Sequence, residues 1–303
     1  MAIRLRPLPA PVRTGARVGV MALAGAPNQE ALTAGLEWLQ GQGFEVVPAT
    51  NLLARAGYLA GSDEQRLAGL VALLEEDVDV LLAARGGFGT TRLLSKLPWD
   101  RLAAWGGWIV GFSDLTALHA AAQSRFPFAT LHGPVVTSLR TDPRSGEMLL
   151  AWLRGTAPRR IFKVGEANVV RSGIARGVSV GGNLSLLASL VGTPFEADLD
   201  GAVVFLEDVG EPLYRLDRLL TQLRLSSRLA RVKAVVSGKL IRCGRGEHGW
   251  RLRWRALVEE AVPPEAVVVE GLPFGHGKAN LPFPLGVEVE VDTIRGQISW
   301  GGA

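Results

Sequence analysis

Short apolar runs with the length of β-strands alternate with helical segments through the first half of this 303-residue chain. Leucines recur at helical spacing in residues 28–42, and Ser62-Asp63-Glu64-Gln65 has the form of a capping box that begins a second helix. Alternation of this kind predicts a mostly parallel sheet that is covered by helices on both faces. Strands are expected at residues 17–23, 44–47, 78–83, 108–110 and 128–131.

Three segments of unusual composition follow three of these strands. Residues 85–89 (RGGFG) come after the third strand, 111–114 (GFSD) after the fourth, and 132–134 (HGP) after the fifth. Ligands of open α/β sheets bind outside the carboxyl ends of the strands, and these three segments share that edge. The candidate site is therefore expected there.

The second half of the chain begins with a weaker pattern. Prolines, scattered charges and glycines between residues 141 and 178 are typical of a segment that crosses between domains. We therefore expect a first domain over residues 1–140, a crossing segment over 141–178 and a second α/β domain over 179–303.

A renewed periodic pattern defines the second domain. The strictly alternating VEVEVD segment, residues 287–292, predicts a half-exposed strand at an edge of a sheet. Helices are expected from the GGNLS segment to residue 191 and over 212–225, and strands at 202–206, 234–237 and 266–269.

The basic residues cluster in one region of the second domain. Ten lysines and arginines lie between Arg224 and Arg255 against one acid, Glu247, with Trp250 and Trp254 among them. This mixture is typical of nucleic-acid surfaces, but no signature of a nucleic-acid module accompanies it. We favour a solvated helix face, or a field that attracts an acidic small substrate, and expect no nucleic-acid partner.

Cysteine usage and hydropathy suggest the compartment. Cys243 is the only cysteine, which excludes an internal disulfide and a cysteine-rich metal site and fits a reducing environment. No apolar run reaches the ~18 residues of a membrane span. Arginines ahead of residues 18–26 imitate a secretory signal, but prolines interrupt the basic part and a buried first strand explains the same residues. We expect a cytoplasmic protein without a membrane partner.

Ser113 lies where the fourth strand turns into a helical segment, and two interpretations compete. Ser113 or Asp114 could cap the helix by accepting from the N–H groups of its first turn. Alternatively, the corner projects a serine hydroxyl beside backbone donors, which is the geometry of a nucleophile elbow. A serine nucleophile needs a base, and the base needs an orienting acid.

Four histidines are candidates for the base. His119 faces another side of the helix from Ser113 and is better explained as a satisfied core histidine, and His248 lies in a solvated Arg/Gly loop. His132 ends a strand at the correct edge of the sheet. His276 lies between two glycines after another strand, where its ring could reach a cleft. The residues alone do not separate His132 from His276.

The candidate acid is Glu207, which follows the strongly apolar strand AVVFL. Asp208 or Glu211 could take its place, and an ordinary solvated carboxylate at a strand end is the alternative. The chain order Ser113, Glu207, His276 matches that of α/β-hydrolases, although GFSD lacks the second glycine of their G-x-S-x-G motif.

The glycine turn at residues 85–89 has two possible uses. Its backbone N–H groups could hold a phosphate at a helix N-terminus, but the Lys-Ser/Thr of a P-loop is missing. The same groups, at Gly86 and Gly87, could instead complete an oxyanion hole with the amide of Asp114.

Taken together, these segments resemble the LD-carboxypeptidase family of serine peptidases, which also includes the microcin C immunity hydrolases. The opening strand and loop lack a serine often found there, which puts that loop's contacts in doubt. The segments that carry the resemblance, in chain order, are ARVGVMALAGAP, ARGGFG, GFSDLTALH, LHGP, GGNLSLLASLVGTPF, FLEDVGEPLYRLDRLLTQL and GLPFGHG.

The resemblance implies a fold and a site. The fold is α/β, with an N-terminal flavodoxin-like sheet, mostly parallel and with helices on both faces, and a smaller C-terminal α/β swivelling domain. The nucleophile is Ser113, the base His276 and the orienting acid Glu207. Because these residues lie on different domains, the site is expected at the domain interface. The resemblance also implies oxyanion donors at Asp114 and the Gly86–Gly87 turn, no metal, no cofactor and a homodimer.

The expected reaction is removal of the terminal D-alanine from a murein tetrapeptide through an acyl-enzyme, as part of peptidoglycan recycling. The terminal carboxylate of this small peptide needs a cationic partner, and Arg85 and Arg215 flank the site segments. Pairing of Arg215 with Glu211 at helical spacing is the competing interpretation. Asn183 and His132 are further candidates for substrate binding.

Two alternative functions are compatible with the sequence. The first is a microcin C-type immunity hydrolase that cleaves aminoacyl or peptidyl nucleotides. That subgroup resembles this chain but carries a tryptophan that stacks on adenine ahead of the GGN segment, whereas no tryptophan occurs here between Trp152 and Trp250. The second is not an enzyme: a flavodoxin-like protein that binds a phosphate or another ligand at the GGFG turn.

Overall fold

The computed structural model describes residues 4–301 and divides into two compact units. One, the Ser113 unit, comprises residues 7–157 and 278–284. The other, the His276 unit, comprises the described residues up to Arg6, residues 158–277 and those from 285 onward. The expected crossing segment, residues 141–178, is thus divided between the units, and residues 278–284 return to the Ser113 unit.

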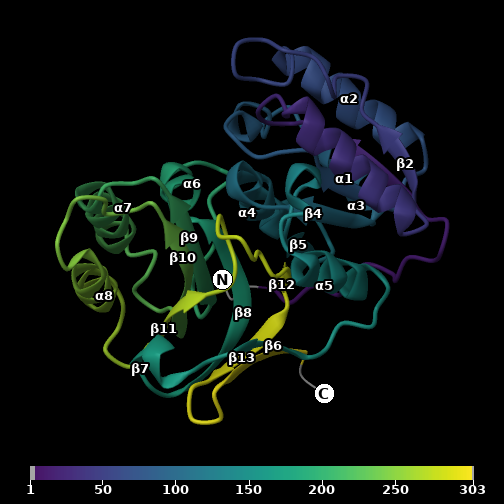
Figure 1. The fold of residues 1–303 in the computed structure, drawn as a ribbon. Helices are drawn as coiled ribbons and strands as arrows, with labels where there is room; N and C mark the ends of the chain where they lie inside the picture. Colours follow the sequence, from purple (N-terminus) through teal and green to yellow (C-terminus); the bar gives the residue numbers. More distant parts are fainter. Residues whose placement is uncertain (1–3, 302–303) are drawn as a thin grey trace. The chain divides into compact units, whose positions relative to one another are not determined.

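The Ser113 unit is built on a six-stranded sheet with the order β12-β5-β4-β3-β1-β2. Of these strands, β2, β4, β5 and β12 are labelled in Figure 1. Strands β1 to β5 pair in parallel, and their order in the sheet, 2-1-3-4-5, is that of flavodoxin-like folds. Its strands are β1 (Arg17–Met21), β2 (Glu45–Pro48), β3 (Val80–Ala83), β4 (Trp108–Gly111), β5 (Thr130–His132) and β12 (Phe283–Leu285).

The helices of this unit form two groups, as expected for a sheet covered on both faces. Trp38 of α1 packs on Gly146 of α5, whereas α3 packs against both α2 and α4. The capping box predicted at Ser62 is present. The helices are α1 (Gln29–Gly41), α2 (Asp63–Glu75), α3 (Trp99–Trp105), α4 (Thr116–Arg125) and α5 (Pro143–Leu153), with the 3₁₀ helices η1 (Thr90–Arg92), η2 (Ser113–Leu115) and η3 (Val136–Ser138).

The His276 unit contains an eight-stranded mixed sheet with the order β6-β14-β13-β8-β9-β10-β11-β7. The four central strands from β8 to β11 are parallel, and antiparallel strands flank them. The strands are β6 (Arg160–Lys163), β7 (Val169–Arg171), β8 (Ile174–Asn183), β9 (Val203–Val209), β10 (Ala234–Ile241), β11 (Val267–Leu272), β13 (Glu288–Asp292) and β14 (Gln297–Trp300). The helices are α6 (Leu184–Ser189), α7 (Leu213–Leu225) and α8 (Trp250–Ala261), with the 3₁₀ helix η4 (Glu166–Asn168).

One sequence prediction about this region is wrong, and several elements were not predicted. The segment 141–178 contains α5, β6, β7 and the start of β8, where the sequence pattern is weak. The strand at 287–292 is half-exposed, as predicted, but β13 lies between β14 and β8 and not at an edge. Alternation of apolar and acidic residues reports that one face of a strand is exposed, and says nothing about how many neighbours the strand has.

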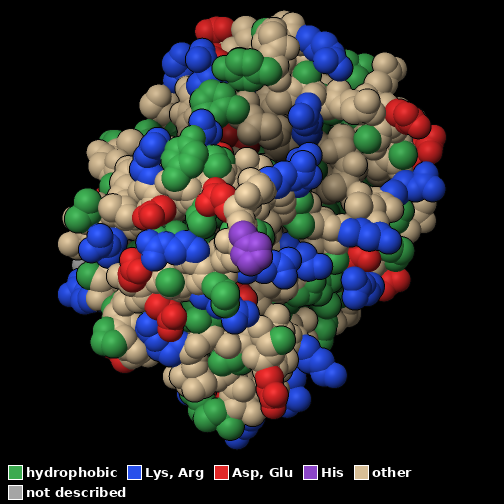
Figure 2. Space-filling view, turned by 60° about the vertical axis from the view of Figure 1, so that its left-hand side comes forward, with side chains coloured by type: hydrophobic (Ala, Val, Ile, Leu, Met, Phe, Trp, Pro, Cys, Tyr) green, Lys and Arg blue, Asp and Glu red, His purple; other side chains and the backbone are tan. Residues whose placement is uncertain are grey.

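The cluster of basic residues predicted on a helix face lies partly on α8, and acids compensate it. Arg253 and Arg255 pair with Glu260 and Glu270, and Arg228 pairs with Glu196 at 2.7 Å. In Figure 2, where the left-hand side of Figure 1 comes forward, acidic side chains lie among the basic ones. Among the described residues, no helix is both long and apolar enough to cross a membrane.

Candidate active site

The corner that carries Ser113 has a strained backbone. β4 ends at Gly111, and Ser113 begins η2 with a φ of +62°, in the left-handed region that serine seldom adopts. The N-cap of the following α4 is Leu115, and no side chain caps that helix. Helix capping by Ser113 or Asp114 therefore does not explain the corner. Strain of this kind is typical of functional positions, where the surrounding structure imposes it.

The glycine turn packs directly on this corner. A Cβ atom built at Gly86 would lie 3.0 Å from Ser113 Oγ and 2.9 Å from Ser113 Cβ, so a larger residue would displace the serine. Gly87 has a φ of +114°, which excludes a side chain on conformational grounds. The carbonyl of Gly86 accepts a 3.0 Å hydrogen bond from the amide of Gly25 in the loop after β1. The turn is thus held from one side by that loop and touches Ser113 on the other.

Asp114 joins the corner to the end of the glycine turn. Its side chain is fully buried, and Oδ2 accepts a 2.8 Å hydrogen bond from the amide of Thr90. Burial raises the pKa of the Asp114 carboxyl, while hydrogen bonds from Thr90 and Gly89 act in the opposite direction. The residue after the serine therefore serves as a buried link and not as a solvated acid.

His119 is the satisfied core histidine that its position in the sequence predicted. Nε2 lies 2.9 Å from the Gly111 carbonyl and Nδ1 2.9 Å from Thr130 Oγ1. Because a carbonyl only accepts, Nε2 carries the proton and Nδ1 accepts from the threonine hydroxyl. Burial lowers the pKa of His119 to about 4, so the ring is neutral near pH 7. The prediction is confirmed.

His132, one of the two candidate bases, lies in an aromatic cluster. The side chain is fully buried at the end of β5. Its ring stacks on Phe283 at a centroid distance of 4.8 Å and meets the edge of Phe112 at 6.0 Å. Since the carboxylate of Glu207 contacts a different histidine, the structure favours His276 over His132 as the histidine with an acid partner.

Glu207 and His276 form a close pair in the His276 unit. Glu207 is fully buried in the last part of β9, and its Oε2 lies 2.6 Å from Nδ1 of His276, whose side chain is 19% exposed. The carboxylate accepts a hydrogen bond from Nδ1–H, which leaves the basic lone pair of the neutral ring on Nε2. Gly275, at a φ of +91°, makes this approach possible, because a Cβ there would lie 2.6 Å from Glu207 Oε2.

The neighbouring Asp208 has a different environment. Its Oδ2 accepts from the amide and hydroxyl of Ser185 at 2.9 and 2.8 Å, and its Oδ1 accepts from the amide of Val209 at 2.8 Å. This carboxylate is therefore committed to the N-terminus of α6. The ion pair of Glu211 is with Arg215, so of the three candidate acids it is Glu207 that meets a histidine.

Asn183 connects the two carboxylates. It is the N-cap of α6, where its Oδ1 accepts from the Leu186 amide, and its Nδ2 donates to Glu207 at 3.3 Å and to Asp208 at 3.1 Å. The side chain is 4% exposed. In this structure it supports the acid and is not directed to solvent as a substrate-binding residue would be.

The two candidate arginines differ in their partners. Arg215 forms the competing ion pair predicted from the sequence, with Glu211 at 3.4 Å. Arg85 donates from Nη1 to the carbonyl of Ala26 at 2.7 Å, and among the described residues no carboxylate forms an ion pair with it. Of the two, Arg85 has the guanidinium that is not committed to an acid of the protein.

Sequence reasoning missed Thr90 and Gly275. The glycines around His276 were visible in the sequence, but the reason for Gly275 is a contact with a residue 68 positions away, since Glu207 and Gly275 meet only in the fold. Nothing in the sequence marks Thr90 as the partner of Asp114. In the described part of the chain, no group of three or more His, Cys, Asp or Glu residues could hold a metal ion.

Models of two domains match the chain. The LD-carboxypeptidase N-terminal domain matches residues 18–133, and the LD-carboxypeptidase C-terminal domain matches residues 176–291. A Streptomyces coelicolor protein named as a carboxypeptidase is 40% identical over 96% of this chain and 95% of its own length. The murein tetrapeptide carboxypeptidase of Pseudomonas aeruginosa is 34% identical over 89% of this chain and 91% of its own.

Solved structures share the fold. The muramoyltetrapeptide carboxypeptidase from Oxalobacter formigenes superimposes with a TM-score of 0.81 at 27% identity, covering 94% of this chain and 97% of its own. MccF in complex with glutamyl sulfamoyl guanosine gives a TM-score of 0.86 at 22% identity, covering 98% of both chains. With both domain models in order and a relative at 40% identity over nearly the whole length, the chain belongs to the LD-carboxypeptidase family.

Proposed function

We propose that this protein is a serine carboxypeptidase that removes the terminal D-alanine of murein tetrapeptides by cleaving their L,D peptide bond. The observation that carries the proposal is the Glu207–His276 pair, a buried carboxylate 2.6 Å from an imidazole, in a chain 34% identical to a murein tetrapeptide carboxypeptidase. The strained Ser113 and the glycine turn against it support the same reaction.

The proposed first step is acylation of Ser113. Nε2 of His276 accepts the Ser113 hydroxyl proton while Oγ attacks the carbonyl that precedes the terminal D-alanine. The proposal requires these two atoms to come within hydrogen-bond distance during the reaction. Glu207 holds the tautomer of His276 and stabilises the imidazolium that forms. The amide of Asp114 and the Gly86–Gly87 turn donate to the oxyanion.

The second step returns the enzyme to its starting state. The imidazolium of His276 donates its proton to the leaving nitrogen, the C–N bond breaks and D-alanine departs. Water, deprotonated by His276, then attacks the acyl-Ser113 ester. The imidazolium returns this proton to Ser113 Oγ as the ester C–O bond breaks, and the tripeptide leaves with a new carboxylate. No metal ion and no cofactor have a part in this proposal.

Recognition of the chain end is assigned to an arginine. A terminal carboxylate beside the scissile bond needs a charged donor, and the planar guanidinium suits it. Arg85 is favoured over Arg215, because Arg215 already pairs with Glu211. Asn183 and His132, which we expected among the substrate-binding residues, have no such part in the proposal because both are buried within their own units.

A microcin-type hydrolase is the second candidate, since the MccF fold covers 98% of this chain. The main proposal has closer sequence support, at 34% identity against 25% for the Escherichia coli microcin C7 self-immunity protein MccF. Incubation of the purified protein with a murein tetrapeptide and, separately, with an aminoacyl sulfamoyl nucleotide distinguishes them. Release of D-alanine and tripeptide, detected by mass spectrometry, supports the carboxypeptidase. Cleavage of the nucleotide alone overturns it.

Amidation of the tetrapeptide's terminal carboxylate tests end recognition. We expect kcat/KM to fall about 30-fold to several-thousand-fold, since losing one partner of a desolvated charge pair costs ~2–5 kcal/mol. Arg85→Met should lose a similar factor on the free acid and little more on the amide. Equal cleavage of amide and acid would instead indicate an amidase or endopeptidase.

Compartment and assembly complete the proposal. We place the protein in the cytoplasm, in support of which Cys243 is a single buried thiol whose pKa burial raises to about 11. The family resemblance supports a homodimer. Size-exclusion chromatography with light scattering would test this by measuring the molar mass of the protein in solution.

A further inference from the structure

The peptide unit that joins Gly89 to Thr90 is held at both of its polar ends by buried charged side chains. The carbonyl oxygen of Gly89 accepts a 3.0 Å hydrogen bond from Nη1 of Arg66. The amide nitrogen of Thr90, across the same peptide bond, donates to Oδ2 of Asp114 at 2.8 Å. Arg66 and Asp114 are both fully buried. Two buried side chains thus fix the orientation of one peptide plane from opposite ends.

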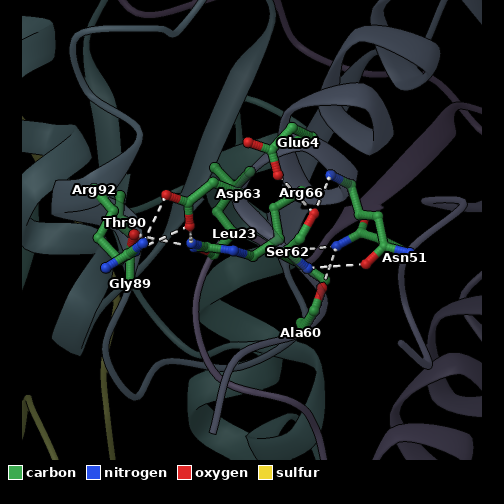
Figure 3. A network of polar contacts seen from close by, with 12 residues as sticks. Leu23, Asn51, Ala60, Ser62, Asp63, Glu64, Arg66, Gly89, Thr90 and Arg92 are labelled. Carbon is green, nitrogen blue, oxygen red and sulfur yellow. Dashed lines mark hydrogen bonds and ion pairs between the residues drawn. The ribbon is translucent and has the colours of Figure 1, made fainter. Parts of the chain in front are cut away.

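Arg66 also reaches a second loop. Nη1 donates to the carbonyl of Leu23 in the loop after β1, and Nη2 lies 2.5 Å from Asp63 Oδ1 (Figure 3). A Cβ atom at Gly89 would lie 2.7 Å from Arg66 Nη1, so the guanidinium occupies the space that a side chain there would need. Gly89 is a glycine for this reason as well as for its φ of +139°.

The clamped peptide forms the exit of the glycine turn, and the entrance is held separately. Gly86 is fixed by the amide of Gly25, and Gly86 in turn touches Ser113. Asp114, which holds the exit, is the residue next to Ser113. The side chains of Arg66 and Asp114 therefore connect the loops after β1, β3 and β4. These contacts determine the spacing between the turn amides and Ser113.

We propose that Arg66 and Asp114 are positioning residues, which act through the Gly89–Thr90 peptide to hold the Gly86–Gly87 amides in register with Ser113. This inference rests on the proposed function of Ser113 as nucleophile and of the turn amides as oxyanion donors. Neither side chain needs to touch the substrate. Displacement of catalytic groups by about 1 Å can lower the rate about 100-fold even when binding is retained.

The two side chains also interact electrostatically. Burial raises the pKa of Asp114, and the charge of Arg66 acts in the opposite direction. Removing the charge of Arg66 therefore leaves the buried Asp114 carboxyl with less compensation and also leaves Asp63 without this partner, which destabilises the fold. The variants that test the proposal must therefore keep the volume and, where the chemistry permits, the hydrogen bond.

The decisive variants are Asp114→Asn, Asp114→Ala and Arg66→Lys. Asparagine keeps an acceptor for the Thr90 amide, so kcat should stay within about 3-fold of wild type, whereas Asp114→Ala should lower kcat about 100-fold with KM little changed. The ammonium group of Arg66→Lys cannot bond Gly89, Leu23 and Asp63 together as the planar guanidinium does. The kcat of this variant should therefore lie between those of Asp114→Asn and Asp114→Ala. Arg92→Met is the matched control, because the Arg92 side chain is 49% exposed and pairs with the same Asp63. The bond from Arg92 to the glycine turn is made by its backbone amide, which donates to the Gly89 carbonyl and is kept in this variant.

The rate at which a fluorophosphonate labels Ser113 provides a readout that does not depend on the natural substrate. We expect the labelling rate to follow kcat through the series, with Arg92→Met at the wild-type value. Wild-type kcat and labelling in both Asp114→Ala and Arg66→Lys would overturn the proposal, as would a change confined to KM. If Asp114→Ala does not fold, equal rates in Arg66→Lys and Arg92→Met overturn it. A wild-type protein that is labelled but does not cleave tetrapeptide contradicts only the proposed substrate.

Discussion

The Ser113 corner and the Glu207–His276 pair are built in different ways. At the corner, the geometry is set by backbone: a serine at a φ of +62°, a glycine with no room for a Cβ, and a peptide held at both ends. The pair instead depends on direct contact of two side chains at 2.6 Å. At the corner, many positions accept only a few residue types, because the backbone conformation leaves little choice. The Glu207–His276 pair restricts only its own two positions and the glycine beside them.

The largest expected effect comes from removing the reacting groups. Ser113→Ala and His276→Ala should each lower kcat by about 10⁴-fold or more, because members of a triad act as a unit. The double variant should be little slower than either single one. Steady-state kinetics on tetrapeptide, with circular dichroism to show an intact fold, measure this. Multiplicative losses in the double variant would mean that the corner and the pair are not partners.

A second prediction separates the two adjacent carboxylates. Glu207→Gln should lower kcat about 10³- to 10⁴-fold, because the amide no longer selects the Nδ1–H tautomer of His276. Asp208→Asn should lower kcat far less and should mainly lower Tm, since Asp208 binds the N-terminus of α6. The opposite ranking of kcat would assign the orienting role to Asp208.

Glycine substitutions test the comparison directly. Gly86→Ala should lower kcat about 100-fold by displacing Ser113, with KM less affected. Gly275→Ala should displace Glu207 and also strain a φ of +91°, so it should lower both kcat and Tm. Gly57→Ala is the control, because its φ of +61° is also positive but nothing lies within 4 Å of the new methyl group. Activity losses no larger than that of Gly57→Ala would count against both assignments.

The smallest expected effect concerns His119, whose ring bonds a carbonyl and a hydroxyl instead of a carboxylate. The pKa of His119 is about 4 in the folded protein against 6.5 ordinarily, so the unfolded chain binds a proton first as the pH falls. Stability is therefore lost between about pH 6.5 and pH 4, by up to about 3 kcal/mol. His119→Gln keeps a donor for Gly111 and an acceptor for Thr130 but does not titrate. Urea unfolding at pH 7, 5.5 and 4 should show a weaker acid dependence in this variant, and identical slopes would contradict the explanation.

Much of the fold followed from local signals. The alternation of strands and helices and the capping box at Ser62 depend on residues close in sequence, and both were predicted. The elements α5, β6 and β7 were missed, because prolines, glycines and charges in residues 141–178 hide short elements. The neighbours of β13 could not be predicted either, because strand order depends on pairing partners far along the chain.

The candidate site divides in the same way. Ser113, Glu207 and His276 follow apolar strands and could be picked out as candidates, although their roles came from the family resemblance. The choice between His132 and His276 depended on which ring meets a carboxylate, a contact across 69 positions. The role of Arg66 could not be identified, because the contacts that join the two loops are with the carbonyls of Leu23 and Gly89, and backbone carbonyls leave no mark in the sequence.

The return of residues 278–284 to the Ser113 unit has a consequence for how the chain is made. β12 belongs to the same sheet as β1 to β5, yet it is encoded after nearly all of the His276 unit. When a ribosome has completed residues 7–157, the sheet behind Ser113 still has an unpaired edge at β5. That edge stays open until more than a hundred further residues, His276 among them, have been synthesised. During synthesis, the Ser113 unit therefore cannot complete its sheet before His276, the residue proposed to activate Ser113, has been made.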